Sequence, residues 1–298
     1  MTSRAWAFFI AMCALWGLPY LLIKVAVAEL DPAFLVFVRL GLAAVVLLPI
    51  AAATGSLKRL RRRWRRLVAV AVIGIAIPFS LIAYGEQHIT SSLAALLIAA
   101  DPLMVVVLAL LIDASERTTG VRLIGLLVGL IGVGAVLGFD LGGDAMAMLG
   151  ALFLLGAAAC YAFSALMVKG FGDIPRLGSV TVTLSLATVA LAPSALAHVP
   201  QALPSPAVIV SVLGLGIVCT ALGYFLYYSL IGEAGATRAS LITYVNPAVA
   251  VLLGVLVLGE PLTWATLIGF ALIVLGCALA TEVTGWARVR RKGRLLAS

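Results

Sequence analysis

Residues 91–112 read SSLAALLIAADPLMVVVLALLI, an apolar run that Asp101-Pro102 interrupts near its middle. A helix needs about 20 apolar residues to cross the hydrocarbon core of a bilayer, and this run supplies them. Asp101 lies about 10 residues from each end of the run, so at 1.5 Å per residue it would sit roughly 15 Å deep. The stretch therefore predicts a membrane-spanning helix with an ionisable group and a proline near the bilayer centre.

The rest of the 298-residue chain has the same character. Its composition is 64% apolar and 11% charged, with a mean hydropathy of +1.21, whereas soluble domains average roughly 45–50% apolar and 25% charged. Apolar runs predict an all-α polytopic membrane protein with ten transmembrane helices. The expected spans lie near residues 5–25, 32–53, 67–85, 91–112, 122–139, 146–168, 179–197, 207–230, 237–258 and 265–283.

The basic residues predict the orientation of these spans. With the N-terminus inside, 18 of the 20 Lys and Arg residues fall on the cytoplasmic side, most densely in the loop at 58–66. Positive charge accumulates in cytoplasmic loops of membrane proteins, and one miscounted span would reverse every later loop. We expect a multi-pass protein of the bacterial inner membrane with both termini in the cytoplasm.

The two halves of the chain resemble each other at an offset of 144 or 145 residues. Trp16–Lys24 lies over Tyr161–Lys169, and Asp101-Pro102 lies over Asn246-Pro247. Each half holds five expected spans, an odd number, so the second half enters the membrane from the opposite face. Inverted repeats are frequent in transporters, with the substrate near the midplane between them. The expected units are a first repeat at 1–139, a second repeat at 140–285 and a basic cytoplasmic tail at 286–298.

Short motifs follow one another in a fixed order along the chain. They are Trp16-Gly17 through Lys24, Pro32 with Arg39, His88-Ile89-Thr90, Asp101-Pro102, Gly235–Ser240, Asn246-Pro247 and Leu258-Gly259-Glu260. In this order they resemble the drug/metabolite transporter superfamily, of the EamA-like type with two tandem domains. The resemblance implies a ten-helix fold with a central cavity, and secondary transport of small metabolites, with export of amino acids or related compounds and drugs. Two departures, Tyr161 in place of Trp and the sequence at 112–116, add nothing about the substrate.

The two X-Pro pairs within spans are candidate helix breaks, at Pro102 and Pro247. Each proline leaves the carbonyl four residues earlier, at Ile98 or Thr243, without its helical donor, so the breaks should face protein or a wet cavity. Asp101 and Asn246 are therefore candidate substrate-binding residues. Asp-Pro is also a helix-start pattern, so Asp101 is equally explained as an N-cap.

Arg39, Trp16 and Tyr244 complete the candidate substrate-binding set. Arg39 lies seven residues after Pro32, about 10 Å into the membrane. It could pair with Asp101, bind a substrate carboxylate or extend outward to the interface. Aromatic residues with polar atoms mostly pack or sit at interfaces, but Trp16 and Tyr244 lie within spans beside the motifs.

Lys24, Glu86, His88 and Glu260 lie at the outer ends of expected spans. Ordinary solvation explains all four, and gating is the alternative. His88 with Glu86 is a candidate pH sensor, because histidine titrates near neutral pH.

Several other classes of function find little in the sequence. Its two histidines and four dispersed cysteines suggest no metal set, no cofactor and no enzymatic activity, and the basic residues predict orientation rather than nucleic-acid binding. The expected partners are a small-molecule substrate and the lipid bilayer. Glycines at 125, 129, 132, 134 and 138 predict close helix packing and are also compatible with a homodimer. A non-transporting scaffold or a lipid scramblase stays the alternative function.

Overall fold

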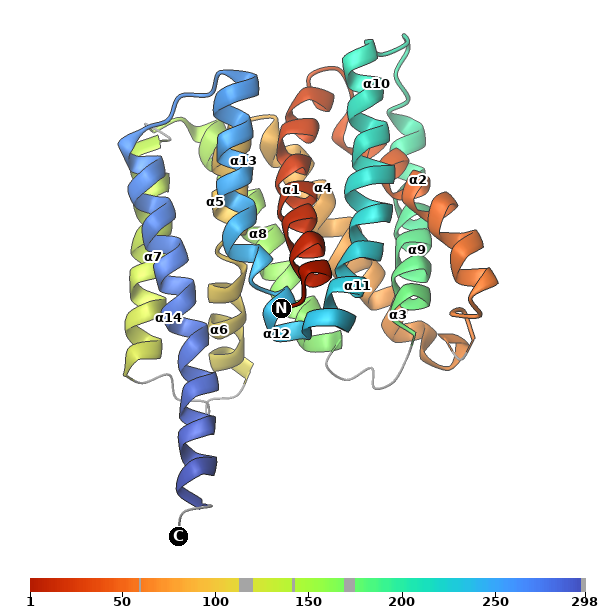
Figure 1. Ribbon diagram of the computed structural model, residues 1–298. Helices are drawn as coiled ribbons and strands as arrows, with labels where there is room; N and C mark the ends of the chain where they lie inside the picture. The colour runs from red at the N-terminus through yellow and green to blue at the C-terminus, as the bar shows by residue number, and fades with distance from the viewer. Residues whose placement is uncertain (59, 113–119, 141–142, 169–174, 296–298) are drawn as a thin grey trace.

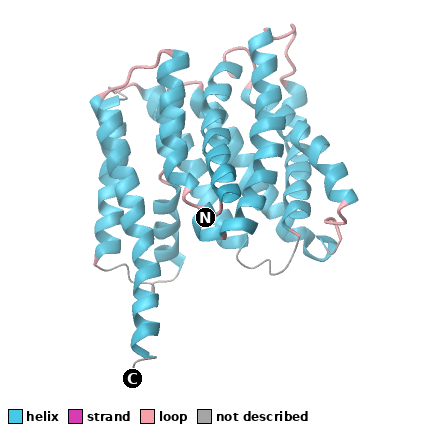
Figure 2. Ribbon diagram, in the orientation of Figure 1, coloured by secondary structure: helices cyan, strands magenta, loops and turns pink. Residues whose placement is uncertain are grey.

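The computed structural model describes residues 1–58, 60–112, 120–140, 143–168 and 175–295, and all regular secondary structure in this part is helical (Figures 1 and 2). Seven stretches are long and apolar enough to cross a bilayer, and three shorter apolar helices accompany them. The seven are Ser3–Ala26, Pro32–Ala53, Trp64–Glu86, Ser91–Leu108, Ala145–Val168, Arg176–Ala197 and Pro206–Ala234, and the three are Leu123–Gly138, Ile242–Leu258 and Trp264–Ala280. The prediction of an all-α polytopic membrane protein is confirmed.

Several of these stretches are divided into shorter elements. In chain order the elements are α1 (Ser3–Ala26), α2 (Pro32–Ala53), η1 (Leu60–Arg63), α3 (Trp64–Ala71), η2 (Val72–Ala76), α4 (Ile77–Glu86), α5 (Ser91–Ile98), α6 (Asp101–Ile112), α7 (Val121–Asp140), α8 (Ala145–Val168), α9 (Arg176–Ala197), α10 (Pro206–Leu213), η3 (Gly214–Leu222), α11 (Gly223–Ala234), α12 (Ala236–Ala239), α13 (Ile242–Leu258) and α14 (Trp264–Leu295). The basic segment expected as a tail from residue 286 continues α14 as helix to Leu295.

Helix starts follow the capping residues of the sequence. The Thr2 hydroxyl accepts from the Ala5 N–H, the Asp31 carboxylate accepts from the Ala33 N–H, and Thr90 caps α5 in the same way. Such side chains satisfy backbone donors that lack a helical acceptor. Local sequence thus defines where α1, α2 and α5 begin.

Two π-helical segments occupy equivalent places in the two halves. η2 lies between α3 and α4, and η3 lies between α10 and α11, about one repeat offset later. A π-helical turn inserts an extra residue between hydrogen-bonded partners and rotates the side chains that follow it. The sequence offered no prediction of either segment.

The helix break at Asp101-Pro102 is present, because α5 ends at Ile98 and α6 begins at Asp101. The predicted break at Asn246-Pro247 is wrong, since α13 runs through Pro247 without interruption and the second break lies earlier, between α12 and α13. A proline removes one hydrogen bond from a helix but does not by itself end it when the freed carbonyl has polar surroundings. Pro247 leaves the Thr243 carbonyl without a helical donor, and Thr243 lines a cavity.

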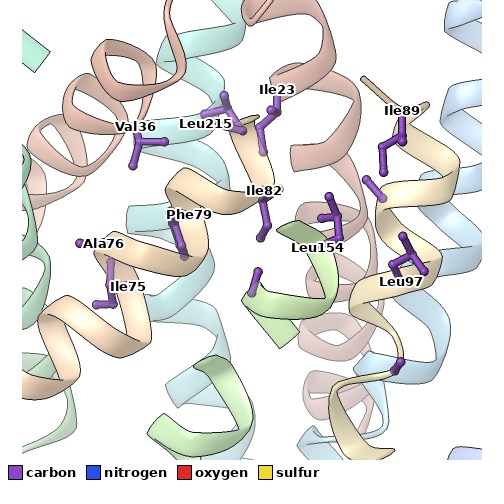
Figure 3. Packing of buried hydrophobic residues seen from close by; sticks show 14 of the residues in the cluster. Ile23, Val36, Ile75, Ala76, Phe79, Ile82, Ile89, Leu97, Leu154 and Leu215 are labelled. Carbon is purple, nitrogen blue, oxygen red and sulfur yellow. The ribbon is translucent and has the colours of Figure 1, made fainter. Parts of the chain in front are cut away.

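Helices of the two halves alternate through the molecule. α1 packs against α13, α2 against α9, α4 against α8 and α7 against α14. Figure 1 shows the last pair at one side of the bundle. Buried side chains of α1, α2, α4, α5, α8 and η3 form one hydrophobic cluster around Ile82 and Leu154 (Figure 3). The halves therefore share one core.

The α7–α14 pair depends on glycine. A Cβ at Gly125 would lie 2.5 Å from the Ala280 nitrogen, and one at Gly276 would overlap the Gly129 backbone, whereas a Cβ at Gly134 would meet nothing within 4 Å. Small residues let helix backbones approach closely in membranes. This role within one chain is the observed use of Gly125, Gly129 and Gly276.

We predict that Gly276→Ala destabilises the protein, because the added methyl has to push against backbone of α7, and overpacking costs about 1–3 kcal/mol. Gly134→Ala is the matched control, since alanine is a better helix former by about 1 kcal/mol and meets open space there. Thermal unfolding in detergent, followed by fluorescence-detected size exclusion, should show a lower apparent midpoint for Gly276→Ala. Equal midpoints for the two variants would contradict the packing argument.

Candidate functional site

A cavity of about 300 Å³ lies where the two halves meet. Residues of both halves line it: Trp16, Pro19, Tyr20, Ile23, Arg39, Phe79, Ile82, Ala95, Ile98, Ala99, Asp101, Pro102, Tyr161, Cys219, Thr220, Tyr224, Thr243, Asn246 and Pro247. The lining combines apolar and aromatic walls with a few polar groups, which is typical of small-molecule sites. Trp16, Arg39, Asp101 and Asn246, four of the five residues expected at a substrate site, lie in this one lining.

Arg39 is held in place from two sides. Its side chain is 8% exposed, its Nε donates to the Thr220 hydroxyl at 3.1 Å, and its guanidinium carbon lies 4.4 Å from the centre of the Phe79 ring. The Thr220 hydroxyl in turn donates to the Leu215 carbonyl at 2.7 Å, five residues back along η3. Within the described residues the guanidinium makes this one hydrogen bond. An extension of Arg39 outward to the membrane surface, one of the sequence hypotheses, is wrong.

Asp101 and Asn246 line the cavity, and each has a buried side-chain oxygen. Their Oδ1 atoms are inaccessible and have no hydrogen-bond partner among the described residues. The first backbone donors of α6 bond instead to the Ala100 carbonyl, so the Asp101 carboxyl does not act as the cap of that helix. Buried acceptors without donors are costly and uncommon. No ion pair joins Asp101 to Arg39 in the described part of the chain, so both remain available to a ligand.

Aromatic side chains form one wall of the cavity. The Trp16 ring lies 5.8 Å from the Tyr224 ring and 4.8 Å from that of Tyr227. The absence of a side chain at Gly223 makes room for the indole, since a Cβ there would lie 2.7 Å from its nitrogen. Tyr244, expected in the site, does not line the cavity and packs against the hydrophobic core.

Sequence reasoning missed Tyr20, Phe79 and Thr220. Tyr20 follows Trp16 by four residues, so helical spacing could have placed both on one face of α1. Thr220 faces the cavity from within the π-helical η3, where ordinary helical spacing does not apply.

Side-chain hydrogen bonds join three segments at one end of the bundle. The segments are residues 24–32, 84–92 and 258–264, and we call this end the Lys24 end. The Glu260 carboxylate accepts from the Ser91 and Ser92 N–H groups at 2.7 and 3.0 Å and from the Ser92 hydroxyl at 2.5 Å. Lys24 Nζ donates to the Glu86 and Ile89 carbonyls at 2.6 and 2.7 Å. Glu260, in the second half, thus binds the start of α5 in the first.

Ordinary solvation does not account for two of the four residues at this end for which it was expected. Glu86 is 0% exposed and Glu260 is 9% exposed, so the expectation that solvent explains them is wrong. The reason is tertiary, because α1, α4, α5 and the turn before α14 converge there.

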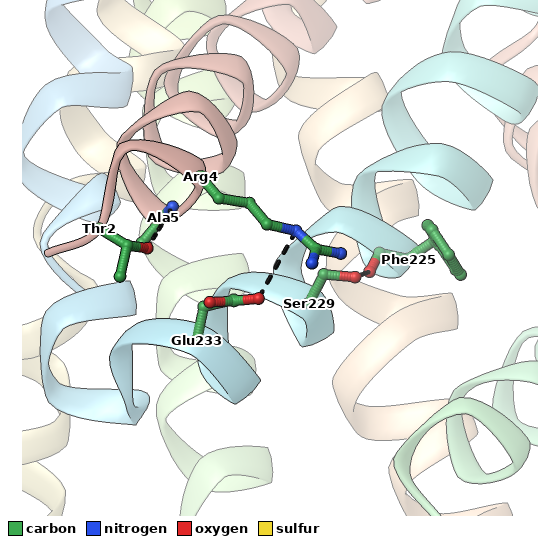
Figure 4. Close-up of polar contacts among 6 residues, drawn as sticks. All are labelled: Thr2, Arg4, Ala5, Phe225, Ser229 and Glu233. Carbon is green, nitrogen blue, oxygen red and sulfur yellow. Dashed lines mark hydrogen bonds and ion pairs between the residues drawn. The ribbon is translucent and has the colours of Figure 1, made fainter.

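The opposite end shows a weaker contact. Arg4 Nε lies 3.5 Å from a Glu233 carboxylate oxygen, and the side chains are 73% and 32% exposed (Figure 4). Exposed ion pairs contribute about 0–1 kcal/mol. This contact between α1 and α11 can open at little cost.

The fold is that of a multi-pass membrane protein with a cavity between two halves. A family model, the EamA-like transporter family, matches the chain twice, at residues 4–138 and 148–281. The chain belongs to this family. Its members are named as transporters rather than enzymes.

Individual proteins agree with this assignment. The chain is similar to a protein of Salmonella typhimurium named "Probable amino-acid metabolite efflux pump", with 28% identity over 94% of each chain. It is also similar to the "Uncharacterized inner membrane transporter YedA" of Escherichia coli K12, at 25% identity over 91% of this chain and 88% of the relative. A solved crystal structure superposes with a TM-score of 0.64 at 22% identity, covering 95% of this chain and 98% of that one, which supports the fold.

We predict that Glu260→Gln lowers thermal stability. An amide cannot accept from all three donors, and a hydrogen bond to a charged group contributes about 1.5–3 kcal/mol. Glu29→Gln is the control, because the Glu29 carboxylate accepts one bond, from the Ser205 N–H at 2.7 Å, in an exposed setting. Unfolding in detergent should begin at lower temperature for Glu260→Gln than for Glu29→Gln; the reverse order would refute a structural role for Glu260.

Proposed function

We propose that the protein is a secondary transporter that exports small metabolites of the amino-acid type by alternating access. The observation that carries the proposal is the cavity between the halves, in which a buried guanidinium and two buried, unpartnered oxygens share one lining. At about 300 Å³ it lies at the small end of ligand sites, which span roughly 300–1,000 Å³. A compact metabolite fits this volume better than a large drug.

The polar groups of the cavity match a zwitterion. The terminal nitrogens of the Arg39 guanidinium suit a carboxylate, because their N–H donors form a planar fork. The Oδ1 atoms of Asp101 and Asn246 suit an ammonium group, which offers three donors. The aromatic wall around Trp16 then receives an apolar side chain. Such a ligand gives each of these buried, unpartnered oxygens a donor.

The arrangement of the halves supports alternating access. Helices of one half pack on helices of the other, and the two halves would exchange conformations if they are inverted repeats. The basic residues favour cytoplasmic termini, and the Lys24 end would then face outward from an inner membrane. The units we propose to move are residues 1–139 and 140–285.

We predict that Asn246→Ala and Asp101→Asn each reduce transport while leaving expression intact, because each removes a buried acceptor from the ligand. Counterflow in proteoliposomes with a panel of radiolabelled amino acids, their decarboxylated amines and their deaminated acids measures this. Zwitterions should exchange best. The apparent affinity for each analogue that lacks the carboxylate or the ammonium group should be at least about tenfold lower, or 1.4 kcal/mol weaker. Tyr84→Phe, outside the cavity lining, is the control. Wild-type kinetics in both cavity variants would refute the assigned site. Failure of the wild-type protein to exchange any compound of the panel would refute the proposed function.

Thr220 offers a sharper test of the carboxylate subsite. Thr220→Val keeps the shape of the side chain but removes the acceptor of Arg39 Nε, and we expect about a tenfold higher KM for zwitterions. Thr220→Ser restores the hydroxyl and should recover most of this loss. Amines without a carboxylate should bind both variants equally. An equal loss for amines would show that Thr220 acts on the fold and not on Arg39.

A further inference from the structure

Glu86 is a buried acid that the substrate site does not use. It ends α4 at the Lys24 end, is 0% exposed, and neither of its carboxyl oxygens has a hydrogen-bond partner in the part of the chain that the structure describes. Two neighbouring charged groups do have partners: Glu260 binds three donors and Lys24 binds two carbonyls. The carboxyl of Glu86 therefore stands out as a group without a structural function.

The charged groups around Glu86 come from three other parts of the chain. Lys24 and Tyr20 face it from α1, Arg39 from α2 and Glu260 from the turn before α14. α8 presents Gly150 and Leu154 to the neighbouring Gly85, and α5 presents the Ser91 hydroxyl, which is also buried without a partner. His88 follows in the turn after α4, with its Cβ against Gly150.

Helical spacing relates this acid to the cavity. Ile82, one turn before Glu86 on α4, and Tyr20, one turn before Lys24 on α1, both line the cavity. Arg39, on another wall of the same cavity, also acts on Glu86 through its charge. Glu86 itself is absent from the lining and lies about one helical turn beyond Ile82, toward the Lys24 end.

Lys24 can satisfy Glu86 in one of two ways. Its ammonium group donates to the Glu86 backbone carbonyl and to the Ile89 carbonyl, so it already lies next to the acid without forming an ion pair with it. An ionised carboxylate without donors is expensive inside a protein, whereas the neutral acid is tolerated. If Glu86 loses its proton, the ammonium can turn from the two carbonyls to the carboxylate and compensate the charge.

We propose that Glu86 is the proton-binding site that couples export to the pH gradient, with Lys24 alternating between the carbonyls of the α4–α5 turn and the Glu86 carboxylate. This inference rests on the proposed transport function. With Glu86 protonated, Lys24 ties α1 to the α4–α5 turn and the Lys24 end stays closed. With Glu86 ionised, Lys24 leaves those carbonyls and the contact loosens. One proton binds the Glu86 carboxylate from the acidic side of the membrane and leaves it on the other side. No other covalent bond changes.

Proton binding at Glu86 can be tested on the wild-type protein without a substrate. Dicyclohexylcarbodiimide adds to protonated carboxyl groups in apolar surroundings, and peptide mass spectrometry locates the adduct. In liposomes we expect modification of Glu86 that falls at least about tenfold between about pH 5 and about pH 9. Glu260, whose carboxylate accepts three hydrogen bonds, should stay unmodified. No modification of Glu86, or modification that does not change with pH, would overturn the proposal.

The coupling itself is tested with an imposed pH difference. A difference of about one unit can sustain up to about tenfold accumulation on the acidic side in a one-for-one exchange. The probe is the amino acid that gives the strongest counterflow signal. In Glu86→Gln, accumulation relative to counterflow should fall about tenfold, whereas Glu29→Gln, an exposed carboxylate of the same end, should behave as wild type.

The experiments distinguish failure of the Glu86 proposal from failure of the proposed transport function. A wild type that transports but ignores the pH difference, or loss of the response in Asp101→Asn with its retention in Glu86→Gln, would refute the role of Glu86 and leave the transport function standing. A wild type that transports nothing would refute the proposed function, while carbodiimide labelling still reports on the proton site. Lys24→Met should also shift the pH dependence of labelling, and an unchanged dependence would refute the part assigned to Lys24.

Discussion

A backbone group inside a bilayer has no water to bond with, and this constraint explains where the cavity lies. α5 and α6 are separated near Asp101, α12 and α13 are separated by two residues, and Pro247 leaves the Thr243 carbonyl without a helical donor. Such irregular backbone is tolerated in membranes only where protein or water satisfies it. Both Ile98 and Thr243 line the cavity. The irregular backbone of the two halves thus converges on the same space, and a polar site between the halves follows from it.

The contacts between the halves are of a kind that can be exchanged. At the Lys24 end, Glu260 of the second half binds the backbone at the start of α5 in the first, and at the other end the exposed Arg4–Glu233 ion pair also joins the halves. A buried ion pair would resist separation by several kcal/mol. Caps at helix ends can be replaced by water as an end opens, so rigid packing of α7 on α14 can coexist with movement elsewhere.

The sequence predicted the fold class and named four residues that share the cavity lining, and its errors have physical causes. Hydropathy reports burial in lipid directly, so the fold class could be predicted. The motifs singled out Trp16, Arg39, Asp101 and Asn246, and these four residues lie in one cavity lining. Pro247 was taken as a break because a lone proline weakens a helix, but only the tertiary surroundings of Thr243 decide whether the helix ends. Glu86 was taken as solvated because a span end is usually wet, and its burial depends on four segments distant in sequence. The position of Thr220 in the cavity lining could not be predicted from helical spacing, because a π-helical segment changes the face that a residue occupies.

The distribution of charge across the cavity also bears on its chemistry. Arg39 is anchored through Nε and the Phe79 ring, which fixes its orientation and leaves its terminal nitrogens without a hydrogen bond in the described part of the chain. Asp101 and Glu86, by contrast, have no donors among the described residues. In the proposed transport of zwitterions, a fixed cation suits the substrate carboxylate, because binding then needs little reorganisation. In the same proposal, acids without donors suit partners that bind and leave, an ammonium group at Asp101 and a proton at Glu86, because each binding event satisfies the carboxyl group. The fixed charge and the two acids thereby lie on different helices, with Arg39 and Asp101 in the cavity lining and Glu86 outside it.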